Sequence, residues 1–338
     1  MPIHVTSEGR RSLRWATVSL AAVGLLLAAL APQGSHAQQG WPNRPIKLVI
    51  PFPAGGATDT LGRVLAQALE AGIGQPVVVD NRPGAAGAIG SSAVEKSAPD
   101  GYTLLLGTSS THSILPHLAS KPPYDAINDF TPIAQVAEGA SLLVVAPSLP
   151  ATTLAQLIAY GKENPGKLSY GSSGIGSIPH LNGAYFGGLA GIQITHVPYK
   201  GSSLAYPDLK AGRVDLMVDS IVSALPQVRG GTVRALAITS TRRSSLAPEI
   251  PTLAESGLPS FQSTVWFGLF GPKKMDPALT ASIAAATTKA LQSADLKARY
   301  AGLGVEASAL GPAEFARTIA QESDKWKKVI AEHKIVAE

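Results

Sequence analysis

The chain has 338 residues, of which 45% are hydrophobic and 15% are charged, and its formal net charge is +5 at pH 7. This composition is typical of compact globular proteins and argues against a disordered chain. The small, dispersed charge argues against a nucleic-acid-binding surface, although it slightly favours an anionic small ligand. The length suggests two domains, with one large α/β domain as the alternative. The chain has no cysteine, so we expect core packing without disulfides to stabilise it.

The first 37 residues predict a secretory signal peptide. Arginines precede an uncharged apolar run at 16–31, and Ser35 and Ala37 supply small residues at the positions that a signal peptidase reads. A membrane anchor is the alternative, but the run is shorter than the roughly 20 apolar residues of a spanning helix. We therefore expect export of the chain and cleavage after Ala37.

Short β-rich runs alternate with helical stretches through the rest of the chain. We predict strands at 46–51, 76–80, 103–108, 141–146, 168–171, 194–199, 214–219 and 233–239. We predict helices at about 59–71, 86–97, 111–118, 152–163, 178–190, 202–211, 221–229, 276–292 and 312–332. Apolar strands that are each followed by a helix indicate an α/β fold with mainly parallel sheets covered on both faces.

Two proline-containing segments, 119–140 and 241–272, interrupt this alternation. We interpret both as crossings between domains. The first domain would then contain residues 38–139 and 265–338, and the second would contain residues 140–264. The C-terminal helices would pack back against the first domain.

Two glycine-rich turns each follow a predicted strand and precede a predicted helix. They are PFPAGGATDT at 51–60, the first loop, and GSSGIGSIPH at 171–180, the serine loop. Such a turn presents unpaired backbone N–H groups at the positive end of a helix, and glycine lets an anion approach closely. Two facing turns at the carboxyl ends of strands would clamp an anion. The alternative is that the glycines only satisfy tight turn geometry.

Neither loop matches a motif for a cofactor or for catalysis. No lysine follows the glycines as in a phosphate-binding P-loop, and the dinucleotide and hydrolase-elbow patterns fail at Pro179 and Ile175. The histidines form no metal-binding motif. A secreted hydrolase would use Ser172 or Ser173 with His180, but no acid that orients this histidine is evident. We therefore predict no cofactor, no metal and no catalytic residue.

Several long motifs resemble one family in order and spacing. They are WPNRPIKLVIPFPAGGATDTLGR, VVVDNRPGAAGAIGSSAVEKSAPDGYTLLLGTSS, YGSSGIGSIPHL, VPYKGSSLAYPDLKAGRVDLMVDS and PTLAESGLPSF. They are similar to the Bug family, the extracytoplasmic solute-binding receptors of tripartite tricarboxylate transport. The resemblance runs from about Trp41 to the C-terminus. One departure is Leu204-Ala205, where many members have proline and alanine.

The resemblance implies a periplasmic, monomeric binding protein of the two-domain Venus-flytrap type (type II), with a doubly wound, mainly parallel sheet in each domain. Its ligand would be a small carboxylate, namely a di- or tricarboxylate, an aromatic acid or an amino acid. The domains would close by a hinge near 138–142 and 262–266. Its partner would be the permease subunits of a tripartite transporter, or alternatively a membrane sensor. Neither nucleic acid nor a reaction is implied.

The resemblance also implies which residues surround the ligand. The first loop would hold one end of it through Phe52, Ala54, Gly55, Gly56, Thr58 and Asp59. The serine loop would hold the other end through Ser172, Ser173, Gly174, Gly176, Ser177 and His180. Ser109 and Asp219 would form part of the cleft wall. We expect Asp59 to lie in the first turn of the following helix, where it stabilises the helix dipole, and to select an amine or bind a water beside an anionic ligand.

Overall fold

A computed structural model describes residues 40–118 and 121–336, so the predicted signal peptide lies outside the described residues. The fold lies in one compact unit, Arg44–Glu338. Its strands are β1 (Ile46–Ile50), β2 (Val77–Asn81), β3 (Thr103–Thr108), β4 (Phe130–Val145), β5 (Leu168–Ser172), β6 (Ile194–Pro198), β7 (Leu216–Ser220), β8 (Arg234–Ile238), β9 (Thr264–Pro272) and β10 (Val305–Leu310).

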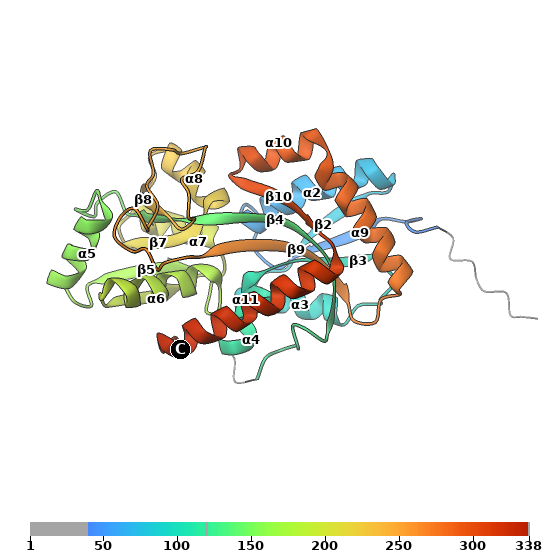
Figure 1. Cartoon of the computed structure of the whole chain (residues 1–338), viewed down its shortest axis with the longest axis horizontal. Helices are drawn as coiled ribbons and strands as arrows, with labels where there is room; N and C mark the ends of the chain where they lie inside the picture. The colour runs from blue at the N-terminus through green and yellow to red at the C-terminus, as the bar shows by residue number, and fades with distance from the viewer. Residues whose placement is uncertain (1–39, 119–120, 337–338) are drawn as a thin grey trace, which may run out of the picture. The chain divides into compact units, whose positions relative to one another are not determined.

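The helices alternate with the strands over most of the chain (Figure 1). They are α2 (Ala57–Ile73), α3 (Ala88–Glu95), α4 (Leu115–Leu118), α5 (Leu154–Glu163), α6 (Ile178–Ala190), α7 (Ser202–Lys210), α8 (Ile221–Arg229), α9 (Pro277–Gln292), α10 (Ala294–Gly302) and α11 (Pro312–Glu332). Two single turns, η1 (Ala85–Gly87) and η2 (Ser110–Ile114), precede α3 and α4.

The strands form two sheets that share β4. In sheet A, β2, β1 and β3 are parallel, and β9, β4 and β10 join them in antiparallel pairs. In sheet B, β6, β5 and β7 are parallel, and β4 and β8 are antiparallel to their neighbours. Each sheet therefore has the parallel core that the strand–helix alternation predicts.

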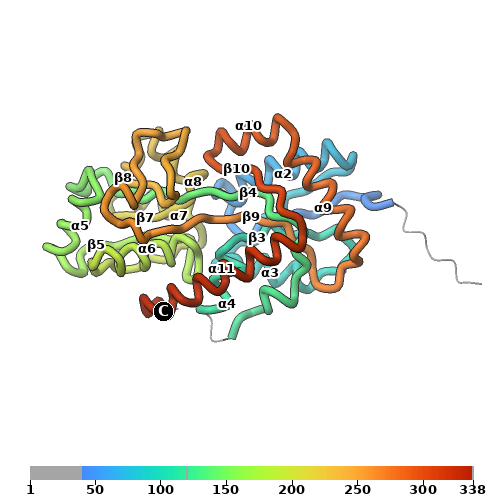
Figure 2. The backbone as a smooth tube through the Cα atoms, in the orientation of Figure 1, coloured from blue at the N-terminus to red at the C-terminus, as the bar shows by residue number. Residues whose placement is uncertain are grey.

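The shared strand β4 contains 16 residues. Its first part, up to Ala140, pairs with β9, whereas its last part, from Ser141, pairs with β7 and β8. Figure 2 shows the chain passing in this way from the α9 side of the unit to the α5 side. Residues 130–140, the second half of the segment 119–140 that we interpret as a crossing, therefore belong to a strand.

Three elements were not predicted from the sequence: β9, β10 and α10. The prolines and glycines around β9 are typical of loops, so the sequence pattern did not predict a strand there. In the structure β9 is buried along almost its whole length. Its Gly268 is required by packing, because a Cβ there would lie 2.0 Å from the ring of Phe315 on α11. Tertiary contacts of this kind decide the conformation, and the local sequence does not contain them.

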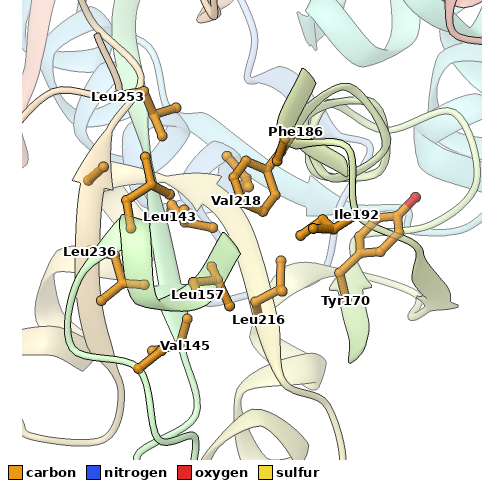
Figure 3. Close-up of a cluster of buried hydrophobic side chains, with 14 of the residues drawn as sticks. Leu143, Val145, Leu157, Tyr170, Phe186, Ile192, Leu216, Val218, Leu236 and Leu253 are labelled. Atoms are coloured by element: carbon orange, nitrogen blue, oxygen red, sulfur yellow. The ribbon is translucent and has the colours of Figure 1, made fainter. Parts of the chain in front are cut away.

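Apolar side chains from strands and helices fill the core of sheet B (Figure 3). Leu143 of β4, Leu216 and Val218 of β7, Leu157 of α5 and Phe186 of α6 are all fully buried in this cluster. Burying each such side chain contributes roughly 1.5–3 kcal/mol. The strands are apolar on both faces because helices cover them, which explains the near-continuous hydrophobic runs in the sequence.

Helix α11 contacts elements of both sheets. Near its middle, the backbone carbonyl of Ile319 accepts a hydrogen bond from Ser113, which follows β3 of sheet A. Just beyond its end, His333 packs edge-on against Tyr185 of α6, which covers sheet B. The sequence predicts that the C-terminal helices pack against the first domain. The residue just after α11 also contacts α6, which covers sheet B.

Candidate functional site

A cavity of about 60 Å³ lies at the carboxyl ends of the parallel strands. The sheet A side lines it with Phe52, Pro53, Gly56, Ala57, Thr58, Thr108, Ser110, Val265 and Phe267. The sheet B side lines it with Ser173, Ile178, Pro179, Gly201, Ser202, Ser203, Asp219, Ser220 and Ser223. Ligands of open α/β sheets generally bind at this end of the strands.

Four helices begin at the cavity. Gly56 precedes α2, Gly201 precedes α7 and Ser220 precedes α8, and in none of the three does a side chain cap the helix. The first residues of α6, Ile178 and Pro179, line the cavity as well. Helix starts carry partial positive charge on unpaired N–H groups. No lysine or arginine is among the described lining residues, so backbone groups provide the attraction for an anion.

Asp59 determines the shape of the first loop. Its carboxylate accepts hydrogen bonds from the backbone N–H of Gly55, from the side-chain amide of Asn81 and from Arg63. Burial alone would raise the pKa of Asp59, but the bonds from these three donors outweigh it, so the pKa lies below its usual value. Asp59 lies in the first turn of α2, as expected, but it does not line the cavity.

The serine loop is held by its own polar groups. Ser177 caps α6 by accepting from the backbone N–H of His180, and its hydroxyl donates to the carbonyl of Gly174 over 2.6 Å. His180 Nδ1 accepts from the backbone N–H of Gly176 over 3.1 Å. Gly174 and Gly176 have φ angles of 120° and 87°, which strongly favour glycine. These contacts fix the shape of the serine loop before α6.

Contacts across the cavity join the sides of sheets A and B. The backbone N–H of Ile178 donates to Ser110 Oγ over 2.9 Å. Gly201 lies so close to the first loop that a Cβ on it would be 2.5 Å from Pro53 Cγ. The structure therefore represents a closed arrangement of the two sides.

Asp219 is a buried acid in the cavity wall, and only 3% of it is exposed. Its two carboxylate oxygens accept hydrogen bonds from Ser202 at 2.8 Å and Tyr206 at 2.9 Å. Burial raises the pKa of Asp219 despite these bonds. Asp219 thus fastens the start of α7 to the end of β7.

The structure brings five of the predicted ligand-binding residues to the cavity: Phe52, Gly56, Thr58, Ser173 and Asp219. The other nine do not line it: Ala54, Gly55, Asp59, Ser109, Ser172, Gly174, Gly176, Ser177 and His180. Most of these hold the loops in shape. Ser109, for example, accepts a hydrogen bond from the backbone N–H of Trp266 and so ties the end of β3 to β9.

Sequence reasoning missed the lining residues that follow β3, β6 and β7. Thr108 and Ser110, Ser202 and Ser203, and Ser220 and Ser223 all occupy strand ends or the turns and helix starts that follow. Applying the strand-end rule to every predicted strand would have found these hydroxyls. Val265 and Phe267 had no such signal because β9 was not predicted.

The serine loop lacks the geometry of a hydrolase. Ser172 Oγ lies 2.6 Å from Nε2 of His196, whereas among the described residues neither Ser172 nor Ser173 forms the hydrogen bond to His180 that the hydrolase alternative requires. His180 and His196 stack on each other with ring centroids 4.0 Å apart. Burial lowers the pKa of His180 to about 3, with a smaller effect of His196, and lowers that of His196 to about 4. No hydrogen bond among the described residues joins either histidine to a carboxylate, so no triad forms.

The profile of the tripartite tricarboxylate transporter family receptor matches residues 61–335. The chain belongs to this family. BugT of Bordetella pertussis is 37% identical to it over 318 residues, which cover 93% of this chain and 96% of BugT. These matches confirm the Bug-family resemblance, and the family consists of solute-binding receptors and not of enzymes.

Solved structures of receptors share the fold. An R. palustris protein solved with adipate is 36% identical, has a TM-score of 0.86, and its match covers 88% of this chain and 99% of that protein. MatC of Rhodopseudomonas palustris, solved with bound malate, is 33% identical with a TM-score of 0.82, and covers 86% of this chain and 100% of its own. The fold class is therefore that of the two-domain periplasmic binding proteins, as predicted. None of the helices in the described part of the chain is long and apolar enough to cross a membrane.

Proposed function

We propose that this protein is a periplasmic receptor that closes on a small carboxylate and presents it to the membrane subunits of a tripartite tricarboxylate transporter. The observation that carries this proposal is the meeting of four helix starts at one cavity that no described lysine or arginine lines. Unpaired N–H groups at such positions bind anions, and the starts of α2, α7 and α8 have no side-chain cap, whereas the N–H groups of Ile178 and His180 in α6 bond to serines. Adipate and malate in two relatives support a carboxylate as the anion.

The proposed movement is a rotation of two domains, residues 38–139 with 265–338 and residues 140–264. The change of partners within β4 between Ala140 and Ser141 supports a hinge near 138–142. The second hinge, near 262–266, precedes or includes the start of β9. Ligand contacts to both sides of the cavity would favour the closed arrangement.

The proposal also covers the export, the oligomeric state and the ligand release of the protein. We expect the protein to lose residues 1–37 during export and to act as a monomer. Because several neutral donors hold the ligand, it is expected to be released unchanged to the permease.

Thermal unfolding of residues 38–338, refolded to remove any ligand bound during expression, tests the proposal. The panel contains mono-, di- and tricarboxylates, aromatic acids and amino acids. A bound acid at about 100 times its Kd adds about 2.7 kcal/mol to the free energy of unfolding and raises the midpoint. If no acid raises the midpoint, and mass spectrometry of the protein as purified finds no carboxylate, the proposed function is wrong.

A further inference from the structure

Three hydroxyl groups in the cavity wall have no hydrogen-bond partner among the described residues. They belong to Thr108, Ser220 and Ser223. Thr108 is 3% exposed and Ser220 is 6% exposed. Buried hydroxyls in folded proteins almost always have a partner, so a group that is absent from the protein chain itself is expected to supply it.

Ser220 departs from the other capping residues of this chain. It occupies the position before α8, where a serine side chain normally accepts from a backbone N–H of the first turn. Ser177 does so at α6 and Ser293 does so at α10, but the hydroxyl of Ser220 makes no such bond. The hydroxyl of Ser220 therefore remains available at the cavity.

The three residues surround the cavity from both sheets. Thr108 is the last residue of β3 in sheet A, and Ser220 is the last residue of β7 in sheet B. Ser223 follows Ser220 by three positions, which places the two on the same face at the start of α8. A ligand group between these sides would contact both.

Asp219 indicates the charge of that group. Its carboxylate already accepts from the hydroxyls of Ser202 and Tyr206, and the backbone N–H of Ser220 bonds to it as well. Because these donors already satisfy the carboxylate of Asp219, an ammonium group of the ligand is not required to pair with it. A ligand carboxylate in direct contact with this buried acid would be repelled, so the carboxylates of the ligand belong at the helix starts. A neutral hydroxyl, which both donates and accepts, fits the three unpaired groups.

We infer that the ligand is a short hydroxycarboxylate whose hydroxyl group binds to Thr108, Ser220 and Ser223. Its carboxylate lies at the helix starts, so this inference rests on the proposed function. The cavity of about 60 Å³ favours a short ligand, since pockets for drug-sized molecules have roughly 300 Å³ or more. Phe52, Val265 and Phe267 provide an apolar wall for the carbon chain.

The test uses isothermal titration of refolded residues 38–338 with succinate, malate and aspartate. These acids have the same carbon chain and differ at one carbon, which carries hydrogen, a hydroxyl group or an ammonium group. We expect malate to bind about tenfold more tightly than succinate, as one or two additional hydrogen bonds provide. The double variant Ser220→Ala/Ser223→Ala should lose this preference, so that the ratio of its affinities for malate and succinate falls to about one.

The control is Ser91→Ala, because Ser91 is also buried but lies on α3 outside the cavity. It should change the affinity for neither acid. Four results would each overturn the inference while leaving the carboxylate receptor intact. The first two are equal binding of malate and succinate, and survival of the malate preference in the double variant. The other two are tighter binding of aspartate than of malate, and binding of only a long acid such as adipate. Failure of every acid to bind would instead overturn the proposed function and the inference with it.

Discussion

The backbone N–H of Ile178 donates a hydrogen bond to Ser110 Oγ over 2.9 Å, and this bond joins the start of α6 to the turn that follows β3. It crosses the cavity and therefore exists only while the two sides are closed. Ser110 occupies the place at which a ligand oxygen would satisfy the same N–H group. The closed arrangement thus depends partly on a side chain that accepts a hydrogen bond from the start of α6, as an anion would.

Replacing this acceptor should open the protein. In Ser110→Ala the backbone N–H of Ile178 has no partner in the closed arrangement. Water can bind this N–H group only if the two sides separate. We expect the radius of gyration of the unliganded variant, measured by small-angle X-ray scattering, to rise above that of the wild type. The free energy of unfolding should fall by less than about 1 kcal/mol, since water replaces the lost bond. An unchanged radius together with a larger loss of stability would contradict this prediction.

Closure should be blocked by one methyl group at Gly201. A Cβ at this position would lie 2.5 Å from Pro53 Cγ, whereas the φ of 163° is accessible to any residue. Gly201→Ala should therefore fold normally but bind its carboxylate at least about tenfold more weakly, a loss of about 1.4 kcal/mol. Gly72→Ala on α2 is the matched control because nothing lies within 4 Å of its added Cβ. Equal affinities of the two variants by calorimetry would show that this contact does not limit closure.

Asp59 should act on stability and not on ligand choice. An amide in Asp59→Asn cannot accept all the bonds from Gly55, Asn81 and Arg63, so the first loop should loosen. The free energy of unfolding in urea should fall by about 1–3 kcal/mol. The relative affinities for succinate and aspartate should stay the same. If the variant keeps its stability but changes this ratio, Asp59 contacts the ligand and selects an amine.

Stability should decrease as the pH falls from 6.5 towards 4. Burial lowers the pKa of His112 and His180 to about 3 each, against 6.5 for a free histidine. Between these values the unfolded chain binds protons that the folded protein does not bind, so each proton favours unfolding. Each histidine contributes a slope of up to about 1.4 kcal/mol per pH unit. Asp219 opposes this trend, because its raised pKa makes protonation favourable in the folded state.

The variant His112→Phe isolates one histidine. His112 is fully buried and stacks on Phe270 with ring centroids 3.9 Å apart, so another aromatic ring keeps the contact. Urea unfolding at pH 6, 5 and 4 should show a slope that is smaller than that of the wild type by up to about 1.4 kcal/mol per pH unit. Identical slopes would mean that His112 is protonated in the folded protein.

The sequence predicts the parallel cores and both glycine loops well, because their signals are local. Gly56 and Gly174 stand in turns between an apolar strand and a helix, and the structure has both turns. Phe52, Thr58 and Ser173 lie at the cavity because the strands place their ends at one edge. The resemblance to the Bug family supplied the ligand class, which the turns alone left open.

The missed features depend on contacts between distant segments. Asp59 and Ser109 are next to cavity-lining residues in the sequence. Their side chains instead form hydrogen bonds with Asn81 and with the backbone of Trp266. Which side of a loop a side chain faces is decided by these partners. Ser220 and Ser223 did have a local signal, because they follow the predicted strand 214–219, but the sequence does not show that they share a cavity with Thr108.

One connection between the proposed domains is a hydrogen-bonded strand and not a flexible linker. β4 keeps partners on both sides of the point between Ala140 and Ser141, where it passes from sheet A to sheet B. Such a connection limits the unliganded protein to a narrow set of relative orientations. The protein therefore loses little conformational entropy when a ligand fixes its two sides in the closed arrangement. For this reason, even a few uncharged hydrogen-bond donors suffice for useful affinity.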